Sequence, residues 1–363
     1  VPHLRFPEFT EEWVNVSLKD VADFQKERIS SGLLDESTYI STENILQNFQ
    51  GVQSAISIPA NTNVVAYKKN DILLSNIRPY LKKAWFSDRI GGCSADVFVL
   101  RSKTCEPEFL YNVIASDKFI NYVMSGAKGV KMPRGDKNQM ESFSFSIPAV
   151  VEQRKISRLF QLLDERIVTQ NKIIEDLKKL KSAISERLLK GVKGSTVLLS
   201  DICDIVKGKQ INGENLSESG NYYVMNGGTE LSGYYDDYNV EANTISISEG
   251  GNSCGYVQFN TSPFWSGGHC YSIQDITDNV DNLYLYHYLK SKEDAIMKLR
   301  IGSGLPNIQK KDLAMFKIKI PAVEQQLKIS IFLSSLERKA EIEERIQNAL
   351  LKEKQYLLHQ MFI

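Results

Sequence analysis

The sequence has no long hydrophobic run, few cysteines and histidines, and no net charge. It contains no stretch of the ~18 apolar residues that a membrane span needs, and residues 1–7 lack the pattern of a signal peptide. We therefore expect a cytoplasmic protein that makes no membrane contact. The five cysteines are odd in number and form no CxxC pair, so they support neither a disulfide framework nor a zinc ribbon, and we expect buried, reduced thiols. The four histidines are too dispersed for a metal cluster.

Motifs that mark catalytic centres are also missing. There is no GxxxxGK[ST] phosphate loop, no HExxH and no GxSxG. The Asn-Pro-Pro-aromatic motif of adenine methyltransferases and a convincing nuclease motif are absent as well. The sequence therefore predicts a protein that is not an enzyme and holds no cofactor or metal of its own.

Charge is balanced overall but unevenly distributed. Lysine plus arginine and aspartate plus glutamate both number 44. Basic residues exceed acidic ones in residues 148–194, whereas acidic residues exceed basic ones in residues 195–320. Because DNA binding needs a basic surface, this balance predicts that any phosphate contacts are shared with a partner protein.

The most informative positive feature is an internal repeat. The stretch Ile147–Ser157 returns as Ile320–Ser330, 173 positions later. The same offset pairs Gly129 with Gly302, Pro133 with Pro306 and Phe143 with Phe316. This offset also aligns Gln153 with Gln326. It aligns Glu152 with Gln325, so the glutamates of the two motifs do not match.

A weaker sequence similarity relates Leu18–Asp23 to Leu199–Asp204 at an offset of 181. The sequences of residues 24–125 and 205–298 hardly match. A period this long describes a duplicated domain rather than a solenoid, with the two copies placed around a pseudo-two-fold axis.

Each copy ends in a segment with the apolar periodicity of a long helix that packs on another helix. Each helix has roughly 40 residues, or about 60 Å at 1.5 Å per residue, and we expect an antiparallel, coiled-coil-like pair that holds two domains apart. An ordinary core helix is the alternative. The expected packing positions are Ile156, Phe160, Leu163, Ile167, Ile174, Leu177, Ile184 and Leu188 in the first helix, and Ile329, Leu333, Leu336, Ala340, Leu350, Leu357 and Met361 in the second.

The predicted fold is α+β, with two β-rich domains at 1–147 and 195–320 and long helices at 148–194 and 321–363. Strands are expected at 72–75, 97–101, 244–248 and 255–259, because these stretches are β-rich or alternating and end in polar turns. Helices are expected near 107–124 and 281–299. The polar loops after the strands are available for recognition.

In the first domain, two clusters carry side chains suited to DNA. Asparagine can pair with adenine, arginine with guanine, and lysine with phosphate. A solvated loop with scattered lysines is the alternative for each. The candidates are Asn76, Arg78, Tyr80, Lys82 and Lys83 in one cluster, and Lys128, Lys131 and Arg134 in the other.

In the second domain, the candidates follow strands or lie near glycines, where the backbone can approach a ligand closely. The carboxylate of Glu249 is suited to accept a hydrogen bond from cytosine N4. Trp265, near Gly267, is interpreted as a core residue. The candidates are Lys207, Lys209, Gln210, Asn226, Ser248, Glu249, Asn252 and His269.

Two unlike domains, each followed by a Pro-Ala motif and a long helix, resemble the DNA-specificity subunit of type I restriction-modification systems. The resemblance covers essentially the whole chain. It is carried by Ile147–Ile156 with Leu163-Asp164, by Ile320–Ile329 with Leu336-Glu337, and by the opening Leu4–Pro7, which is similar to such subunits from low-GC Gram-positive bacteria.

The resemblance implies two target-recognition domains that read the two halves of a split, asymmetric sequence in double-stranded DNA, with the helix pair setting their separation. It further implies two methyltransferase subunits that supply S-adenosylmethionine and catalysis, and restriction subunits that use ATP and Mg²⁺. The alternative is a coiled-coil adaptor that presents two protein-binding domains, which zero net charge favours.

Overall fold

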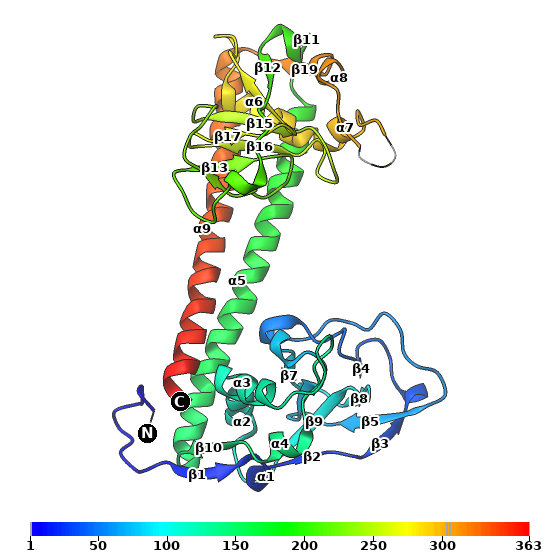
Figure 1. Cartoon of the computed structure of the whole chain (residues 1–363), viewed down its shortest axis with the longest axis vertical. Helices are drawn as coiled ribbons and strands as arrows, with labels where there is room; N and C mark the ends of the chain where they lie inside the picture. Colours follow the sequence, from blue (N-terminus) through cyan, green and yellow to red (C-terminus); the bar gives the residue numbers. More distant parts are fainter. Residues whose placement is uncertain (1, 303, 305, 363) are drawn as a thin grey trace. The chain divides into compact units, whose positions relative to one another are not determined.

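The computed structural model describes residues 2–302, 304 and 306–362, which form two units. The first unit comprises residues 1–170 and 346–363, and the second comprises residues 171–345. Each unit therefore contains one β-rich domain together with part of both long helices, α5 (Val150–Lys190) and α9 (Val323–Met361) (Figure 1).

The first unit contains two four-stranded sheets and a two-stranded ribbon, with strand orders β2-β9-β6-β7, β3-β5-β8-β4 and β1-β10. Its strands are β1 (Val14–Ser17), β2 (Ala22–Phe24), β3 (Arg28–Ser30), β4 (Tyr39–Ile40), β5 (Asn63–Tyr67), β6 (Ile72–Ser75), β7 (Ala84–Phe86), β8 (Gly91–Cys93), β9 (Val97–Ser102) and β10 (Ser144–Ile147). Its helices besides α5 and α9 are α1 (Leu18–Val21), α2 (Pro107–Ile114), α3 (Asp117–Ser125) and α4 (Lys137–Glu141), with short 3-10 turns at η1 (Ser31–Leu33), η2 (Gln47–Phe49) and η3 (Pro79–Leu81).

The second unit has a four-stranded sheet β12-β18-β15-β16, a three-stranded sheet β14-β13-β17 and a ribbon β11-β19. Its strands are β11 (Ser195–Leu198), β12 (Asp204–Lys207), β13 (Tyr222–Met225), β14 (Tyr234–Tyr235), β15 (Thr244–Ser248), β16 (Val257–Asn260), β17 (Trp265–Ser266), β18 (Cys270–Gln274) and β19 (Lys317–Ile320). Its shorter helices are α6 (Asn282–Ser291), α7 (Glu293–Met297) and α8 (Lys310–Ala314), with 3-10 turns at η4 (Leu199–Asp201) and η5 (Gly213–Asn215).

The strands expected at 72–75, 97–101 and 244–248 are present, and the fourth begins at Val257 instead of Gly255. Each expected helix after the strands is instead two helices. The first breaks before Ser116, whose side chain accepts a hydrogen bond from the Phe119 N–H and so begins α3 as its N-cap. The second breaks at Lys292, which has a non-helical backbone between α6 and α7.

The principal sheets of the two units share one register, which extends the repeat beyond the sequence match. Asp23 pairs with Arg101 in the first unit, as Asp204 pairs with Gln274 in the second. At the far end, Ser75 pairs with Val97, as Ser248 pairs with Cys270. The interiors of the two units thus differ in residue identity while sharing a strand register, as expected if the framework is common to both domains and their specificity differs.

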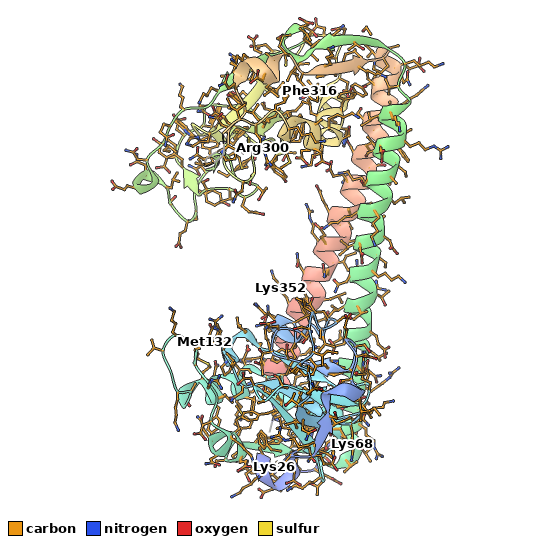
Figure 2. All side chains as sticks on the ribbon, turned by 90° about the vertical axis from the view of Figure 1, so that its right-hand side faces the viewer. Lys26, Lys68, Met132, Arg300, Phe316 and Lys352 are labelled. Carbon is orange, nitrogen blue, oxygen red and sulfur yellow. The ribbon has the colours of Figure 1, made fainter. Side chains whose placement is uncertain are left out.

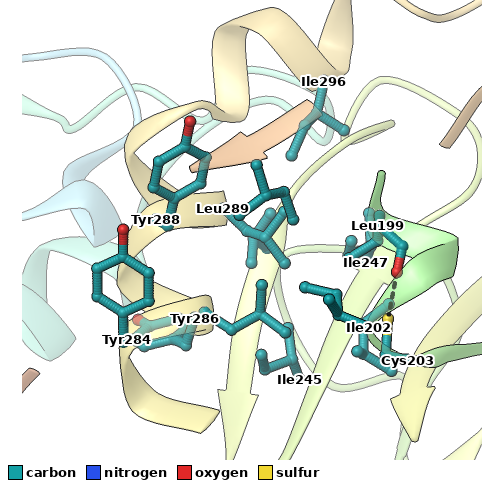
Figure 3. Packing of buried hydrophobic residues seen from close by; sticks show 14 of the residues in the cluster. Leu199, Ile202, Cys203, Ile245, Ile247, Tyr284, Tyr286, Tyr288, Leu289 and Ile296 are labelled. Atoms are coloured by element: carbon teal, nitrogen blue, oxygen red, sulfur yellow. Dashed lines mark hydrogen bonds between the residues drawn. The ribbon is translucent and has the colours of Figure 1, made fainter. Parts of the chain in front are cut away.

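Each domain core includes the beginning of one long helix. In the first unit, Ile156 and Phe160 of α5 are buried with Phe109 and Phe119, and Met361 from the end of α9 joins the same cluster. In the second unit, Ile329 and Leu333 of α9 pack with Leu189 from the end of α5. Figure 3 shows part of this second core, where Ile245 and Ile247 of β15 face Tyr286 and Leu289 of α6.

The helices run antiparallel in both units, as predicted. Lys354 of α9 forms an ion pair with Asp164 of α5 at 2.5 Å in the first unit. In the second unit, Lys181 pairs with Glu337 at 2.5 Å and Lys178 with Glu344 at 2.6 Å, so position numbers fall along α9 as they rise along α5.

All of the predicted packing positions except Leu188 are buried or partly buried. Leu188 is exposed, and the neighbouring Leu189 is the residue that enters the core of the second unit. The apolar periodicity shifts by one residue at the end of α5, because this last turn packs on the domain core. The buried members of the predicted set are Ile156, Phe160, Ile167, Ile174, Ile329, Leu333 and Met361, and the partly exposed members are Leu163, Leu177, Ile184, Leu336, Ala340, Leu350 and Leu357.

The glutamine of the Pro-Ala motif makes equivalent hydrogen bonds in both units. The Gln153 amide donates to the Pro148 carbonyl at 2.8 Å, and its oxygen accepts from the Glu106 N–H at 2.8 Å. Gln326 does the same in the second unit, donating to the Pro321 carbonyl at 2.9 Å and accepting from the Asp281 N–H at 2.8 Å. Each glutamine thus links the start of a long helix to the N-cap residue of a domain helix, Glu106 before α2 and Asp281 before α6, and the offset of 173 is confirmed for this pair.

Glu152 has a role that its counterpart Gln325 does not share. Both Glu152 carboxylate oxygens accept hydrogen bonds of 2.7 Å from Arg5. The backbone N–H groups of His3 and Leu4 donate to the Gln360 carbonyl near the end of α9. Glu152 therefore serves to hold the segment that contains Arg5 against the first unit.

Gln326→Ala is expected to lower the free energy of unfolding by about 2 kcal/mol, because it leaves the Asp281 N–H and two carbonyls without partners in a buried position. Gln153→Ala should have an effect of similar size. Denaturant unfolding followed by circular dichroism measures both. Gln325→Ala, at an exposed position, is the matched control, and an equal loss in that variant would contradict the interpretation.

His287 of α6 provides a pH-dependent test of the second unit. Burial lowers the pKa of this imidazole to about 4, and its Nε2 lies 2.9 Å from Ser334 Oγ on α9. The unfolded chain has the ordinary pKa of about 6.5 and so binds a proton that the folded chain rejects. The free energy of unfolding should reach its full value above pH ~6.5 and fall by about 3 kcal/mol as the pH drops to ~4.

The measurement is urea unfolding at a series of pH values for the wild type and His287→Gln. The variant should show a flatter pH dependence in this range, whereas His359→Gln, at an exposed position, should retain the wild-type slope. Equal slopes in all three proteins would show that His287 is not the responsible group.

Candidate nucleic-acid interface

In the first unit, the structure brings the two predicted clusters together. The segment after β6 lies beside the loop of residues 128–135. The Arg78 N–H donates to the Pro133 carbonyl at 2.8 Å, and the Gly135 N–H donates to the Asn76 carbonyl at 3.1 Å. A β-bridge between Ile77 and Arg134 completes the contact. We call this pair of segments the first paired loop.

The second unit repeats this arrangement at the end of β15. The Gly251 N–H donates to the Pro306 carbonyl at 3.0 Å, and the Ile308 N–H donates to the Glu249 carbonyl at 2.8 Å. Gly250 and Asn307 form the bridge. We call this the second paired loop, and each of these bonds is displaced by 173 positions from its equivalent in the first.

A serine at the end of the strand supports each loop. Ser75 Oγ donates to the Ile77 carbonyl at 3.0 Å, and Ser248 Oγ lies 2.6 Å from the Gly227 carbonyl and 3.3 Å from the Gly250 carbonyl. Ser248 is only 4% exposed. The structure therefore places this predicted contact residue beneath the loop, where it positions the backbone.

The same backbone carries different side chains in the two units. Arg134 of the first paired loop is half exposed, and its guanidinium donates to Asp96 at 2.8 Å. In the second, Asn307 stands at the position of Arg134 and His269 at that of Asp96. Asp96 thereby restricts the orientation of the Arg134 guanidinium.

The other predicted residues of the first unit differ in how exposed their side chains are and in whether they are paired. Lys131 is exposed, and Lys128 pairs with Asp136 at 2.9 Å while remaining 82% exposed. Figure 2 labels Met132 in the same loop, with 48% of its surface exposed. This tip therefore presents lysines and an apolar side chain together.

Three predicted residues lie on the turn that follows Arg78. Tyr80 is exposed, but the Lys82 ammonium pairs with Asp117 at 2.5 Å and the Lys83 ammonium donates to the Thr42 carbonyl at 2.7 Å. The two lysines thus hold parts of the first domain together in this structure, in contrast to Lys131.

Glu249 is the most enclosed charged group of the second paired loop. Its Oε1 accepts hydrogen bonds from the Lys207 ammonium at 2.7 Å and the Tyr271 hydroxyl at 3.1 Å. Its Oε2 is buried without a hydrogen-bond partner among the described residues and lies 3.9 Å from Nδ1 of His269. The side chain of Glu249 is 10% exposed, whereas those of Lys207 and His269 are 54% and 62% exposed.

The remaining predicted residues surround this loop. Asn226 accepts from the His269 N–H at 3.1 Å, which joins the 226–229 turn to the β17–β18 turn. Lys209 and Gln210 follow β12 and are exposed, as is Asn252. Trp265 donates to the Lys209 carbonyl at 3.0 Å and packs edge-on against Tyr235, so it is a half-buried structural residue.

Sequence reasoning missed Asp96 and Asn307. Asp96 stands alone in the sequence before β9. Only the structure shows that it forms an ion pair with Arg134. Asn307 directly follows Pro306, which aligns with Pro133. The same offset of 173 therefore aligns Asn307 with Arg134, so the sequence alone could have identified it.

The cysteines are all free and buried, as predicted. Burial raises the pKa of the Cys93, Cys105 and Cys203 thiols to about 12, and that of Cys270 to about 11. Among residues 2–302, 304 and 306–362, no group of three potential ligands could hold a metal ion. Within the same ranges, no helix is both long and apolar enough to cross a bilayer.

The model of the type I restriction modification DNA specificity domain matches residues 10–179 and 192–352, which is most of the chain. The chain therefore belongs to this family, which consists of specificity subunits and not of catalytic ones. Two copies of the domain account for the internal repeat.

Curated relatives agree with this assignment. The chain is 31% identical over 145 residues to a putative type I specificity subunit of Mycoplasma pneumoniae, a match that spans 39% of this chain and 38% of the relative. It is 24% identical to the type I restriction enzyme MjaVIII specificity subunit of Methanocaldococcus jannaschii, over 98% of this chain and 92% of the relative.

A solved structure shares the fold. The type I restriction-modification system S subunit of M. genitalium superposes with a TM-score of 0.71 at 17% identity, covering 100% of this chain and 99% of that one. The predicted α+β architecture with two repeated domains and long helices is confirmed.

Arg78 offers a test of the backbone of the first paired loop. Its φ of 50° lies in the left-handed region, where its equivalent Gly251 has a φ of 76°. A side chain there costs about 1 kcal/mol, so Arg78→Gly should leave the free energy of unfolding unchanged or raise it by up to that amount. The matched substitution Gly251→Ala should lower stability by about 1 kcal/mol although its Cβ would meet open space. Denaturant unfolding measures both changes, and a clear loss of stability in Arg78→Gly would contradict this view of the loop.

Proposed function

We propose that the two domains bind double-stranded DNA and read the unlike halves of a split, asymmetric sequence through their paired loops. One observation carries this proposal: a single backbone arrangement at the end of β6 and of β15 carries Asn76, Arg78 and Arg134 in one unit and Glu249, Gly251 and Asn307 in the other. A shared framework with different hydrogen-bonding groups suits two domains that do one task on two sequences.

We further propose that this chain acts with methyltransferase subunits, two per complex, and with restriction subunits. S-adenosylmethionine would be bound by the former, and ATP with Mg²⁺ by the latter. Support comes from the names of the relatives and from a second solved structure, described as showing complex assembly and conformational transition of the type I R-M system, which superposes with a TM-score of 0.60 over 96% of this chain and 95% of that one. The expected location is the cytoplasm, where DNA and these partners are found.

The charge of the chain is consistent with shared DNA binding. Exposed cations in or beside the paired loops, such as Lys131 and Lys207, are few among the described residues, and the chain as a whole is neutral. Additional phosphate contacts would then come from the partner subunits.

We also propose that the two long helices set the separation of the half-sites. A helix of 41 residues, the length of α5, extends about 60 Å, somewhat less than two DNA turns of ~34 Å. Replacing residues 1–147 by another recognition domain should change one half-site and leave the spacer as it was.

The proposed function is tested by sequencing the methylome of cells that express this chain with its methyltransferase partner. A split motif with N6-methyladenine should appear that is absent with the partner alone. Arg78→Gly and Arg134→Ala should weaken or relax one half of this motif only, since both residues lie in the first paired loop. Lys352→Ala, at an exposed position of α9 that belongs to neither loop, serves as the control and should leave both halves of the motif unchanged.

DNA affinity of the purified complex supplies the second readout. With about four phosphate contacts, affinity should fall roughly 100-fold between 50 and 200 mM salt. A stable complex that adds no methylation and binds DNA without salt dependence would instead support the adaptor hypothesis.

A further inference from the structure

Glu249 combines three features that no other predicted contact residue of the second unit shares. It follows β15 in the second paired loop, its side chain is nine-tenths buried, and one of its carboxylate oxygens has no hydrogen-bond partner in the part of the chain that the structure describes. A buried acceptor without a partner is costly, so its presence requires an explanation.

The contacts of Glu249 fix the carboxylate while sparing that oxygen. Both the Lys207 ammonium and the Tyr271 hydroxyl bind Oε1. The Tyr271 hydroxyl also lies 3.0 Å from the Ile308 carbonyl in the second segment of the paired loop, so its single proton lies between that carbonyl and Oε1. Oε2 is therefore held in place with its lone pairs uncommitted.

We propose that Glu249 is the residue that selects cytosine in the second half-site, by accepting a hydrogen bond from the exocyclic N4 amine at Oε2. This inference rests on the proposed function and names the base that one of its loops reads.

The chemistry of the four bases favours cytosine. In the major groove, guanine presents two acceptors, thymine presents an acceptor and a methyl group, and adenine sets the acceptor N7 beside its amine. A carboxylate is repelled by each of these acceptors. Cytosine alone offers a donor without an acceptor on the same base edge.

Access to Oε2 depends on an exposed side chain that can move. His269, whose Nδ1 stands 3.9 Å from Oε2, is 62% exposed. Exposed side chains change rotamer within nanoseconds, so His269 can turn away while Lys207 and Tyr271 keep the carboxylate in place through Oε1. Glu249 would thus be uncovered as DNA approaches.

The equivalent position in the first unit shows how the two loops differ. Asn76 stands where Glu249 stands, and the Arg134 guanidinium, held by Asp96, supplies donors beside it. The first paired loop therefore combines the donors of Arg134 with the neutral amide of Asn76, whose Oδ1 is also buried without a partner among the described residues, whereas the second presents the negatively charged carboxylate of Glu249. This contrast provides an internal reference for the experiment.

The experiment compares the complex of the full chain and its methyltransferase partner with the same complex carrying Glu249→Gln, Glu249→Ala or Glu324→Gln. The wild-type motif is determined first by methylome sequencing. The purified complexes then methylate four duplexes that differ only at the cytosine position of the second half-site. Glu324→Gln, on an exposed residue of α9, removes the same charge outside the loop.

The wild type and Glu324→Gln should prefer cytosine by at least about tenfold. Glutamine presents a donor as well as an acceptor and can pair with adenine N6 and N7, so Glu249→Gln should accept adenine about as well as cytosine. Glu249→Ala should lose the preference, and the first half-site should stay unchanged in every variant.

An unchanged second half-site in Glu249→Gln would overturn the proposal. Loss of methylation at all sites, or failure of this variant to assemble, would also overturn it, because Glu249 would then support the fold instead of selecting a base. If the wild-type complex itself produces no split motif, the proposed function fails independently of Glu249.

Discussion

The structure depends on the burial of helix ends in domain cores. An isolated helix of about 40 residues with a narrow apolar stripe is weakly stable in water. Here Ile156 and Phe160 of α5 and Met361 of α9 are buried among the aromatic residues of the first unit. Leu189 of α5 and Ile329 of α9 are buried in the second. Each core therefore stabilises both helices, and each glutamine of the Pro-Ala repeat fastens a helix start to its domain.

A stable framework allows the loops to diverge. The backbone bonds that join the segment after the strand to the loop bearing Pro133 or Pro306 involve main-chain groups, which are the same for most residue types. Side chains on these loops can change without loss of the bonds that shape them. That separation of framework from contact surface explains how one duplicated domain carries an arginine and aspartate pair in one copy and a buried glutamate in the other.

Part of the site could be predicted from residue chemistry. Arg134 is a candidate because it stands in a positively charged cluster among glycines, and Glu249 because its carboxylate suits cytosine N4 and follows a strand. Ser248 was also identified, but it is buried under the loop, and Lys82 and Lys83 are engaged in contacts within the first domain. A side chain's direction depends on neighbours distant in sequence, such as Asp117 and Thr42, so residue type alone could not separate these cases.

The sequence by itself determined the duplication, the two long helices and the family, because repeats and periodic apolar positions are properties of the linear chain. It located most strands for the same reason. Only the tertiary structure decided that Leu189 and not Leu188 enters the core, and that the two clusters of the first domain form one paired loop. It also decided that Glu249 keeps one carboxylate oxygen without a partner among the described residues. These features arise from contacts between segments distant in sequence, whose register is set by the packing of the whole domain.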